Sequence, residues 1–564
     1  MKANSYQRHC AAASLPLVLV FTAVSFLMLS GVLLWTTTTG ALTARHNEYY
    51  TTLAAAEAAT EKVIAKISRD FQNLGVNGVD SNLSSYGALV PTQSEVGDWA
   101  NYSFADPVNG PNATYVTRVA NWQYTDLNWQ YTSFKGHAAT YRVISNTRNT
   151  ASGKNITPSL KQDVQIADIP LFEFGVFYTL DMEICPGSSD MIFTGRVHGN
   201  GSIYCQPGTP RTVTFMDHVT AAQTILHTAS PNDSSIRTLG TVVYQAEHDW
   251  NTSSLNLPIG TNNNPALVHG IIEVPPTSEP TNSLMGLQRY YNKADLIILV
   301  SNSTAVAKSG AYNNFSVNVP WTNISQFVNT NASFYSSREN KTIQATEIDV
   351  QQFTNTYGYL SGVLGRPVKV LYVADLRTQT SSTESGVRLI HGQTLPANGL
   401  TVATCNPLYV KGHYNAPSAS LGTTNTTQTF PASLVADAIT ILSASYSEPN
   451  GGNAASDTTI NAALIAGIVP SAGGVYSGGV ENFFRLLENW SSRTLTVNGS
   501  IVALFPSQIA TASWGASGVY SPPQQRAYSF DFNFKDVNKL PPGTPEVRTL
   551  IRAAWNITQA GSTQ

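Results

Sequence analysis

The chain has 564 residues, of which 12% are charged, and its formal net charge is −3. This length allows two or more hydrophobic cores, and a weakly charged chain without a basic stripe excludes nucleic acid as a partner held by bulk electrostatics. Asn, Thr, Ser and Gly are abundant and there are 25 Tyr. Such a composition favours an exported, strand-rich protein over a cytosolic helical enzyme.

The amino end predicts a membrane anchor. Residues 11–35 form a run of 25 residues without a charge, and about 20 apolar residues are enough to cross the bilayer core. Lys2 and Arg8 precede the run, and no charge follows until Arg45. The positive-inside rule therefore predicts a single-pass protein of a bacterial inner membrane, with a cytoplasmic amino end and a periplasmic or extracellular body. The alternative is a cleaved signal that releases the chain.

The anchor is expected to continue as an amphipathic helix over residues 36–75. Apolar residues recur at spacings of three and four, which places them on one helix face; they are Leu53, Ala56, Thr60, Val63, Ile64, Ile67, Phe71 and Leu74. Gly75 and Gly78 are expected to end this periodicity. A long helix with one apolar face is suited to packing against other such helices.

The anchor followed by LAAAEAATEKVIAKI resembles the amino-terminal segment of PilX-type pilus-assembly proteins and related minor pseudopilins. The resemblance covers about residues 8–70. It implies an assembly role in which the apolar helix packs among other pilin-like or secretion-apparatus subunits. Pilins usually carry a Glu early in the mature helix, whereas the first acidic residue of this chain is Glu48.

The body is predicted to consist mainly of short strands. TYRVISNTRN and LKQDVQIADI alternate apolar and polar residues, and later apolar runs end at small or polar turns every 20 to 30 residues. This period favours a β-solenoid, with a β-sandwich as the alternative. RYYNKADLIILV and VKVLYVADLR indicate buried strands, and TEIDVQQFTNTYGYLSG indicates a helix, within a mixed α/β insertion.

Whole phrases of the body, such as FEFGVFYTLDMEICPGSSDMIFTGRVHGNGSIY and GGVENFFRLLENW, resemble a set of large uncharacterised envelope proteins of verrucomicrobial and planctomycete-type bacteria. The resemblance covers most of residues 165–555. It implies a PilX-like amino end joined to this body and no enzymatic activity.

The stretch MIFTGRVHGNGSIY raises the question of a site. Gly195, Gly199 and Gly201 are expected to allow positive φ and tight turns. Arg196 and His198 are two apart, so on a strand they share a face. That face is interpreted as a solvated ladder in preference to a site, because no nucleophile motif lies nearby.

Five residues from adjacent predicted strands are the candidates for any chemistry: Asp181, Glu183, His198, Asp217 and His218. Asp181 and Glu183 are expected to share a strand face. Carboxylates and imidazoles could hold a divalent cation, yet no HExxH, Cys-x-x-Cys or closely spaced His pair supports a metal site. Asp181, Glu183 and Asp217 would be the acids of a carbohydrate-active enzyme, which is the alternative function. No catalytic residue, metal ligand or cofactor is assigned from the sequence.

The remaining expectations concern cysteines and one acidic motif. Cys185 and Cys205 lie about one predicted coil apart, within reach of a disulfide, and two buried free thiols are the alternative. In VENFFRLLENW, Glu481 and Glu488 are expected in a short amphipathic helix that serves packing.

The sequence thus predicts a membrane-anchored minor pilin-like or pseudopilin-like component of a type IV pilus or type II secretion-like apparatus. Its Tyr, Asn and Thr suit adhesion to a polysaccharide or a surface protein. The expected segments are a cytoplasmic tail (1–10), a transmembrane helix (11–35), an amphipathic helix (36–75), a strand-rich subdomain (76–170), a first β-solenoid-like part (171–240), a mixed α/β insertion (241–385), a second β-solenoid-like part (386–520) and a carboxyl-terminal segment (521–564).

Overall fold

The structure is a computed structural model that describes residues 14–106, 108, 110–235, 237–260, 263–310, 318–449, 452–515 and 522–563. The predicted cytoplasmic tail 1–10, with Lys2, Arg8 and Cys10, lies outside the described residues, and so do residues 11–13 of the apolar run. The chain divides into two compact units. Unit 1 comprises Met1–Trp122, Ala139–Ile166 and Leu550–Gln564, and unit 2 comprises Gln123–Ala138 and Ala167–Thr549.

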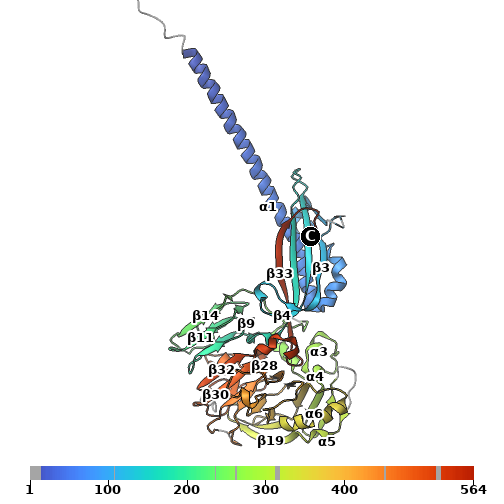
Figure 1. Cartoon of the computed structure of the whole chain (residues 1–564), viewed down its shortest axis with the longest axis vertical. Coiled ribbons are helices and arrows are strands. Elements are labelled where there is room, and N and C mark those ends of the chain that lie inside the picture. Colours follow the sequence, from blue (N-terminus) through green and yellow to red (C-terminus); the bar gives the residue numbers. More distant parts are fainter. Residues whose placement is uncertain are drawn as a thin grey trace, which may run out of the picture. The chain divides into compact units, whose positions relative to one another are not determined.

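Helix α1 spans Ser14–Tyr86 and is the longest element of Figure 1. Residues 14–47 are exposed throughout. The predicted apolar stripe of its second part is confirmed, because the following residues are buried: Leu53, Ala56, Thr60, Val63, Ile64, Ile67 and Phe71. Leu74 departs from the stripe, with 58% of its surface exposed. The next residue, Gly75, has a positive φ of 69° and kinks the helix, which leaves Leu74 outside the contact.

The sequence predicted that the helical periodicity ends at Gly75 and Gly78, and Gly75 does have a non-helical φ and ψ that divide α1 into two helices. A second helix follows the break and runs to Tyr86, and both Val79 and Tyr86 are buried. Asp70 joins the two sides of the kink, because its carboxylate accepts hydrogen bonds from Asn82 Nδ2 (3.0 Å) and the Tyr86 hydroxyl (2.9 Å). The first eleven residues of the predicted strand-rich subdomain, 76–86, are therefore helical.

A six-stranded sheet accompanies α1, with strand order β2-β1-β4-β5-β33 and with β3 paired to β4. Its strands are β1 (Tyr102–Asp106), β2 (Gly110–Pro111), β3 (Tyr115–Asp126), β4 (Lys135–Asn149), β5 (Ser159–Pro170) and β33 (Glu546–Thr558). β1 is antiparallel to both β2 and β4. The runs TYRVISNTRN and LKQDVQIADI, predicted as half-buried strands, lie in β4 and β5.

The core of unit 1 lies between the stripe of α1 and this sheet. It contains Val63, Ile64, Ile67, Phe71, Val79, Tyr86, Ala139, Tyr141, Val143, Val164 and Ile166. Polar contacts fix the same register: Gln162 Nε2 on β5 donates to Thr60 Oγ1 on α1 (2.8 Å), and Arg552 Nη2 on β33 donates to Glu61 Oε2 (2.6 Å). The second part of α1 is thus an integral layer of unit 1.

Unit 2 begins with short strands that enter three sheets in turn. The strands are β6 (Val176–Tyr178), β7 (Met182–Ile184), β8 (Met191–Phe193), β9 (Val197–Gly199), β10 (Ile203–Cys205), β11 (Thr212–Phe215), β12 (Val219–Ala221), β13 (Ile225–Leu226), β14 (Thr241–Tyr244) and β15 (His248–Asp249). Every third strand joins the same sheet in parallel, so Val176, Val197, Val219 and His248 stand in one row. A β-sandwich, by contrast, is built from antiparallel sheets.

The later strands extend one of these sheets and form two others. The twelve-stranded sheet runs in the order β15-β12-β9-β6-β31-β28-β25-β23-β21-β16-β17-β18, beside a six-stranded sheet β19-β20-β22-β24-β26-β29 and a three-stranded sheet β27-β30-β32. Their bounds are β16 (Leu296–Val300), β17 (Ala305–Ser309), β18 (Asn318–Val319), β19 (Val328–Ser336), β20 (Lys341–Asp349), β21 (Val370–Asp375), β22 (Thr383–Ile390), β23 (Leu400–Ala403), β24 (Leu408–Lys411), β25 (Ala432–Ala436), β26 (Ile439–Leu442), β27 (Thr458–Asn461), β28 (Ala463–Ile468), β29 (Phe484–Leu486), β30 (Thr494–Gly499), β31 (Ile501–Pro506) and β32 (Gln525–Phe530).

Residues 241–385 combine strands and short helices. The strands expected in RYYNKADLIILV and VKVLYVADLR are β16 and β21, and both pair within the twelve-stranded sheet. The helices are α2 (Pro265–Val268), α3 (Leu284–Gln288), α4 (Tyr290–Lys293), α5 (Trp321–Ile324) and α6 (Val350–Leu364). The expected helix is α6, which Asp349 caps at its amino end and Gly365 at its carboxyl end.

The prediction of a helix around Glu481 and Glu488 is wrong. Residues Val480–Asn482 form a single 3-10 turn, and Phe484–Leu486 form β29, which pairs in parallel with β26. Pairing with a neighbouring strand satisfies the backbone of this short segment better than an isolated helical turn would. Both carboxylates are buried, and Glu488 accepts hydrogen bonds from Ser443 N (2.6 Å) and Ser443 Oγ (2.7 Å).

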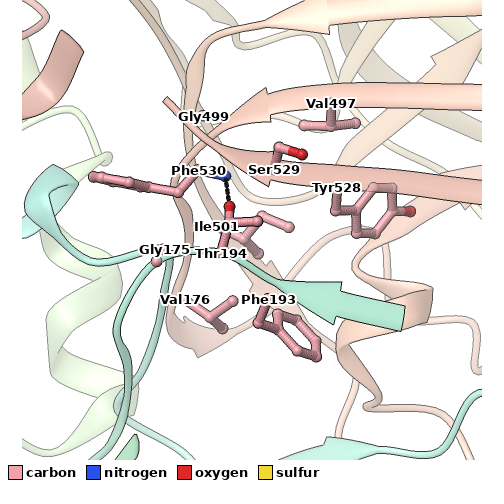
Figure 2. Close-up of a pocket in the computed structure, with 11 residues that line it drawn as sticks. Gly175, Val176, Phe193, Thr194, Val497, Gly499, Ile501, Tyr528, Ser529 and Phe530 are labelled. Atoms are coloured by element: carbon pink, nitrogen blue, oxygen red, sulfur yellow. Dashed lines mark hydrogen bonds between the residues drawn. The ribbon is translucent and has the colours of Figure 1, made fainter. Parts of the chain in front are cut away.

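The early and late strands of unit 2 meet at a seam. β31 pairs in parallel with β6, so that Ile501 aligns with Val176. Figure 2 shows the second contact of the seam, in which Phe530 N at the end of β32 donates to Thr194 Oγ1 over 2.8 Å. The cavity enclosed there has a volume of about 20 Å³, which is room for about one water molecule. The first of the short strands of unit 2, β6, therefore lies in the interior of the twelve-stranded sheet, between β9 and β31.

Close approach, and not positive φ, explains the glycines of MIFTGRVHGNGSIY. None of Gly195, Gly199 and Gly201 is among the described residues with positive φ. A Cβ atom on Gly195 would lie 2.7 Å from Phe530 Cβ, and one on Gly201 would lie 2.7 Å from the backbone nitrogen of Asp181. The seam and the stacked coils leave no space for side chains at these positions.

Candidate binding cleft

Parallel register places residues from three successive coils on one face of unit 2. His198 on β9 aligns with Thr220 on β12, which aligns with Asp249 on β15. Two residues earlier along each coil stand Arg196, His218 and Glu247, because side chains two apart on a strand share a face. These six residues, which we call the coil face, line one cleft of about 840 Å³: Arg196, His198, His218, Thr220, Glu247 and Asp249.

The opposite wall of the cleft is the hairpin loop, defined here as residues 127–134 between β3 and β4. Leu127 N donates to Phe134 O (3.0 Å), which closes the loop, and Trp129–Tyr131 form a 3-10 turn within it. Tyr131 and Phe134 are buried, whereas Trp129 has 69% of its surface exposed. The loop lies within unit 2 and contributes Trp129, Tyr131 and Phe134 to the cleft lining.

Arg196 connects the two walls. Its guanidinium donates to the main-chain oxygens of Gln130 (2.9 Å) and Thr132 (2.8 Å), and it lies 4.5 Å from the centre of the Phe134 ring. Only 6% of its surface is exposed, and its Nε lies 3.7 Å from Asp217 Oδ1. A buried, bidentate guanidinium of this kind fixes the position of the loop backbone. The interpretation of Arg196 and His198 as a solvated ladder is therefore wrong, because both are buried beneath the loop.

His198 is held as a neutral ring. Its Nε2 faces Asn200 Oδ1 (3.0 Å) and its Nδ1 faces Thr220 Oγ1 (2.8 Å). Asn200 is oriented by two hydrogen bonds with the backbone of Leu255, so its oxygen points at the imidazole and accepts the Nε2 proton. The ring also stacks on Phe177, with centroids 5.4 Å apart. Burial lowers the pKa of His198 to about 4, so the ring is neutral and positions Thr220.

Asp217 and His218 form a turn between β11 and β12. Asp217 Oδ1 accepts hydrogen bonds from the backbone nitrogen of His218 (2.7 Å) and from its Nδ1 (2.9 Å). Of the two, His218 lines the cleft. The Asp217 carboxylate contacts both the His218 ring and the Arg196 guanidinium.

Glu183 is held away from the coil face. It lies on β7, in a different sheet from His198, and is buried, with Oε2 accepting a hydrogen bond from Ser471 Oγ (3.0 Å). Burial, which outweighs the Ser471 hydrogen bond, raises the pKa of its carboxyl to about 7, and nearby Asp233 and Glu481 also raise it.

Asp181 and Glu183 were expected to share a strand face, but Asp181 lies outside the strand that holds Glu183. It precedes β7, is exposed, and accepts a hydrogen bond from Ser202 N (2.8 Å). The three proposed acids Asp181, Glu183 and Asp217 thus have separate partners, and the structure does not assemble them as a catalytic pair. Among the described residues, no group of three or more His, Cys, Asp or Glu side chains is arranged to hold a metal ion.

The expected disulfide is not formed in the structure. Cys185 and Cys205 are both free and buried. The register aligns Cys205 with Ile184, so the two cysteines are offset by one residue along neighbouring strands. Side chains offset by one position point to different faces of a sheet, which explains why the coil spacing alone did not bring the sulfurs together. Burial raises the pKa of the Cys185 thiol well above its ordinary range, so it stays protonated.

Sequence reasoning missed Trp129, Glu247 and Asp249. The signal for the two acids lies in the coil register: aligning Val197 with Val219 and His248 brings Arg196, His218 and Glu247 into one row. More residues separate Val219 from His248 than separate Val197 from Val219, so a constant sequence spacing does not reveal this row. Trp129 carries no periodic signal at all, because it belongs to a loop between β3 and β4.

No protein-family profile and no curated protein matches the chain. Among solved structures, the chain is similar to the competence-associated pilin ComZ from Thermus thermophilus. The identity is 10%, the match covers 90% of this chain and 98% of that chain, and the TM-score is 0.25. A TM-score this low does not establish a shared fold, so the function of this chain has to be inferred from its own residues.

Proposed function

We propose that the chain is a membrane-anchored minor pilin-like or pseudopilin-like structural component of a type IV pilus or type II secretion-like apparatus. In this proposal α1 anchors the chain in the inner membrane, and a β-solenoid body presents a binding surface outside. The observation that carries the proposal is the division of α1 into an exposed apolar part and a part packed on a sheet.

The exposed part of α1 has the properties of a helix that crosses lipid. Within the described residues it is long and apolar enough to span a membrane, by length and composition. Its hydroxyl groups are satisfied internally: Thr22 Oγ1 donates to Val18 O (2.9 Å) and Ser30 Oγ donates to Phe26 O (2.7 Å). Such bonds to the preceding turn remove the cost of placing a polar group in hydrocarbon.

The packed part of α1 joins the anchor to unit 1 without a flexible linker. The helix is continuous from Ser14 to the kink at Gly75, and its stripe is buried against the sheet from Leu53 onward. An anchor that is rigidly continuous with a folded layer can transmit the packing of neighbouring anchors to the exported part. This favours a structural subunit over an enzyme that is merely tethered.

The proposed partners follow from the same division. Other pilin-like or secretion-apparatus subunits pack against the exposed part of α1 within the membrane. A polysaccharide or a surface protein is bound by the body, whose parallel strand stack supports the β-solenoid in this proposal.

The test places one charge in the anchor. Leu27→Arg introduces a cation where 72% of the side chain is exposed on the apolar part of α1, and an Arg at the centre of a membrane helix opposes insertion by about 2.5–3.5 kcal/mol. We expect the variant to be lost from carbonate-washed membranes and from sheared surface filaments, whereas the parent is found in both. A deletion of residues 1–75 would also remove the buried stripe of unit 1, so the point substitution is the sharper test.

Thr38→Arg is the matched control, because it adds the same charge to the exposed helix beyond Trp35 and should leave both readouts unchanged. Mass spectrometry of the mature amino terminus completes the test. A parent chain recovered from the medium and beginning after Trp35 would show a released protein and contradict anchoring. A parent that stays in the membrane but is never recovered with filaments would contradict the assembly role.

A further inference from the structure

The hairpin loop presents Trp129 at the cleft in a strained conformation. Trp129 has a φ of 54° and Ser133 a φ of 80°, and neither is a glycine. Left-handed backbone is unfavourable for a bulky residue and persists where the surroundings enforce it. Here the enforcing group is the Arg196 guanidinium, which holds the carbonyls of Gln130 and Thr132. The result is a rigid loop with an indole ring exposed beside the coil face.

The outer coil supplies acceptors that the protein leaves unused. Glu247 and Asp249 are exposed and line the cleft. Within the part of the chain that the structure describes, neither carboxylate has a side-chain hydrogen bond or an ion pair. Two carboxylates and an exposed indole in the lining of one cleft are suited to a ligand that has hydroxyl donors and an apolar ring face.

The spacing of the coils matches such a ligand. Neighbouring strands lie about 4.8 Å apart, which is close to the length of one sugar ring in an extended chain. The row Arg196, His218, Glu247 and the row His198, Thr220, Asp249 each repeat once per coil. Because Arg196 and His198 are buried beneath the hairpin loop, the rings would meet the polar positions of the two outer coils, first His218 and Thr220 and then Glu247 and Asp249.

The charges of the cleft select against an anionic sugar. Arg196 is the one guanidinium among the residues that line this cleft, and it is already bound to two carbonyls and close to Asp217. Glu247 and Asp249 repel carboxylate or sulfate groups. A saccharide without charge satisfies the acceptors and avoids this repulsion.

We propose that the cleft between the hairpin loop and the coil face binds a neutral oligosaccharide, with Trp129 stacking on a sugar ring and Glu247 and Asp249 accepting its hydroxyl hydrogens. This inference deepens the proposed function by naming the ligand class of the external body. It does not depend on α1, so the two ideas fail separately.

The experiment uses the full chain in detergent micelles and measures binding by titration calorimetry. The probes are cellotetraose, maltotetraose and chitotetraose as neutral sugars, tetragalacturonate as an anionic sugar, and tetralysine as a cationic peptide. We expect at least one neutral tetrasaccharide to bind, and tetragalacturonate and tetralysine not to bind. Trp129→Ala should weaken that binding at least about tenfold, and Glu247→Gln combined with Asp249→Asn should weaken it to a similar degree.

Trp250→Ala is the matched control, since Trp250 is also exposed but lies outside the cleft lining. Unchanged thermal unfolding of each variant shows that the fold is kept, which is expected because the altered side chains are exposed. The inference is overturned if no neutral probe binds, if Trp129→Ala binds as tightly as Trp250→Ala, or if tetralysine binds instead. Leu27→Arg should bind the sugar like the parent, which separates this result from the anchoring test.

Discussion

His198 gives the sharpest prediction about the body. In the folded chain its pKa is about 4, because burial disfavours the charged ring, whereas in the unfolded chain it is 6.5. The unfolded state therefore binds the proton more readily, and the stability that depends on a neutral His198 is present above pH 6.5 and is lost as the pH falls toward 4. Between pH 7.5 and pH 4.5 this one group should lower the free energy of unfolding by about 2.5 kcal/mol.

The perturbation is His198→Gln, which keeps hydrogen-bonding groups near Thr220 but cannot titrate. Urea unfolding followed by fluorescence at pH 7.5 and pH 4.5 gives the free energy for the parent and the variant. The parent should lose about 2.5 kcal/mol more than the variant over this range. His248→Gln controls for the loss of one histidine from the chain. Equal losses in parent and His198→Gln would show that the ring is not buried as a neutral group, and the account of the coil face would then be refuted.

Three further predictions concern packing and fixed charges. Ile67→Ala should destabilise unit 1 by about 2–4 kcal/mol in chemical unfolding, whereas Leu74→Ala should change it by less than about 1 kcal/mol; equal losses would contradict the kink. Asp437→Ala should cost about 3 kcal/mol or more in thermal unfolding, because its buried carboxylate accepts three consecutive main-chain N–H groups; a neutral outcome would contradict that network. Arg196→Lys should speed amide exchange in the hairpin loop about tenfold, and unchanged exchange would show that the guanidinium does not hold the loop.

The local pattern of apolar residues was enough to predict the helix and strands whose buried residues follow one regular spacing or one continuous run. The stripe from Leu53 to Phe71 follows helical spacing, and β16 and β21 are continuous apolar runs, so each could be identified from its own residues. Leu74 could not, because its exposure depends on the kink made by the next residue. The segment at Glu481 misled for a related reason: its helical spacing was real, but a partner strand decided its conformation.

The cleft was harder to predict because it depends on register between coils. Arg196 and His198 were singled out, yet their burial comes from a loop far earlier in the chain, which no pattern near them reports. Glu247 and Asp249 become meaningful only when the third coil is aligned with the first two. The cysteines show the same limit, since a shift of one residue in register separates Cys185 from Cys205.

The seam affects the order in which the strands of unit 2 can pair during folding. Ile501 pairs with Val176, so the stack is joined between residues that lie more than half the chain apart. An array in which only neighbouring repeats make contact can fold repeat by repeat, but here β6 pairs with β31, which is synthesised much later. It also follows that a product truncated before residue 501 cannot complete the stack, and that its unpaired strand edge would be open to proteases and to aggregation.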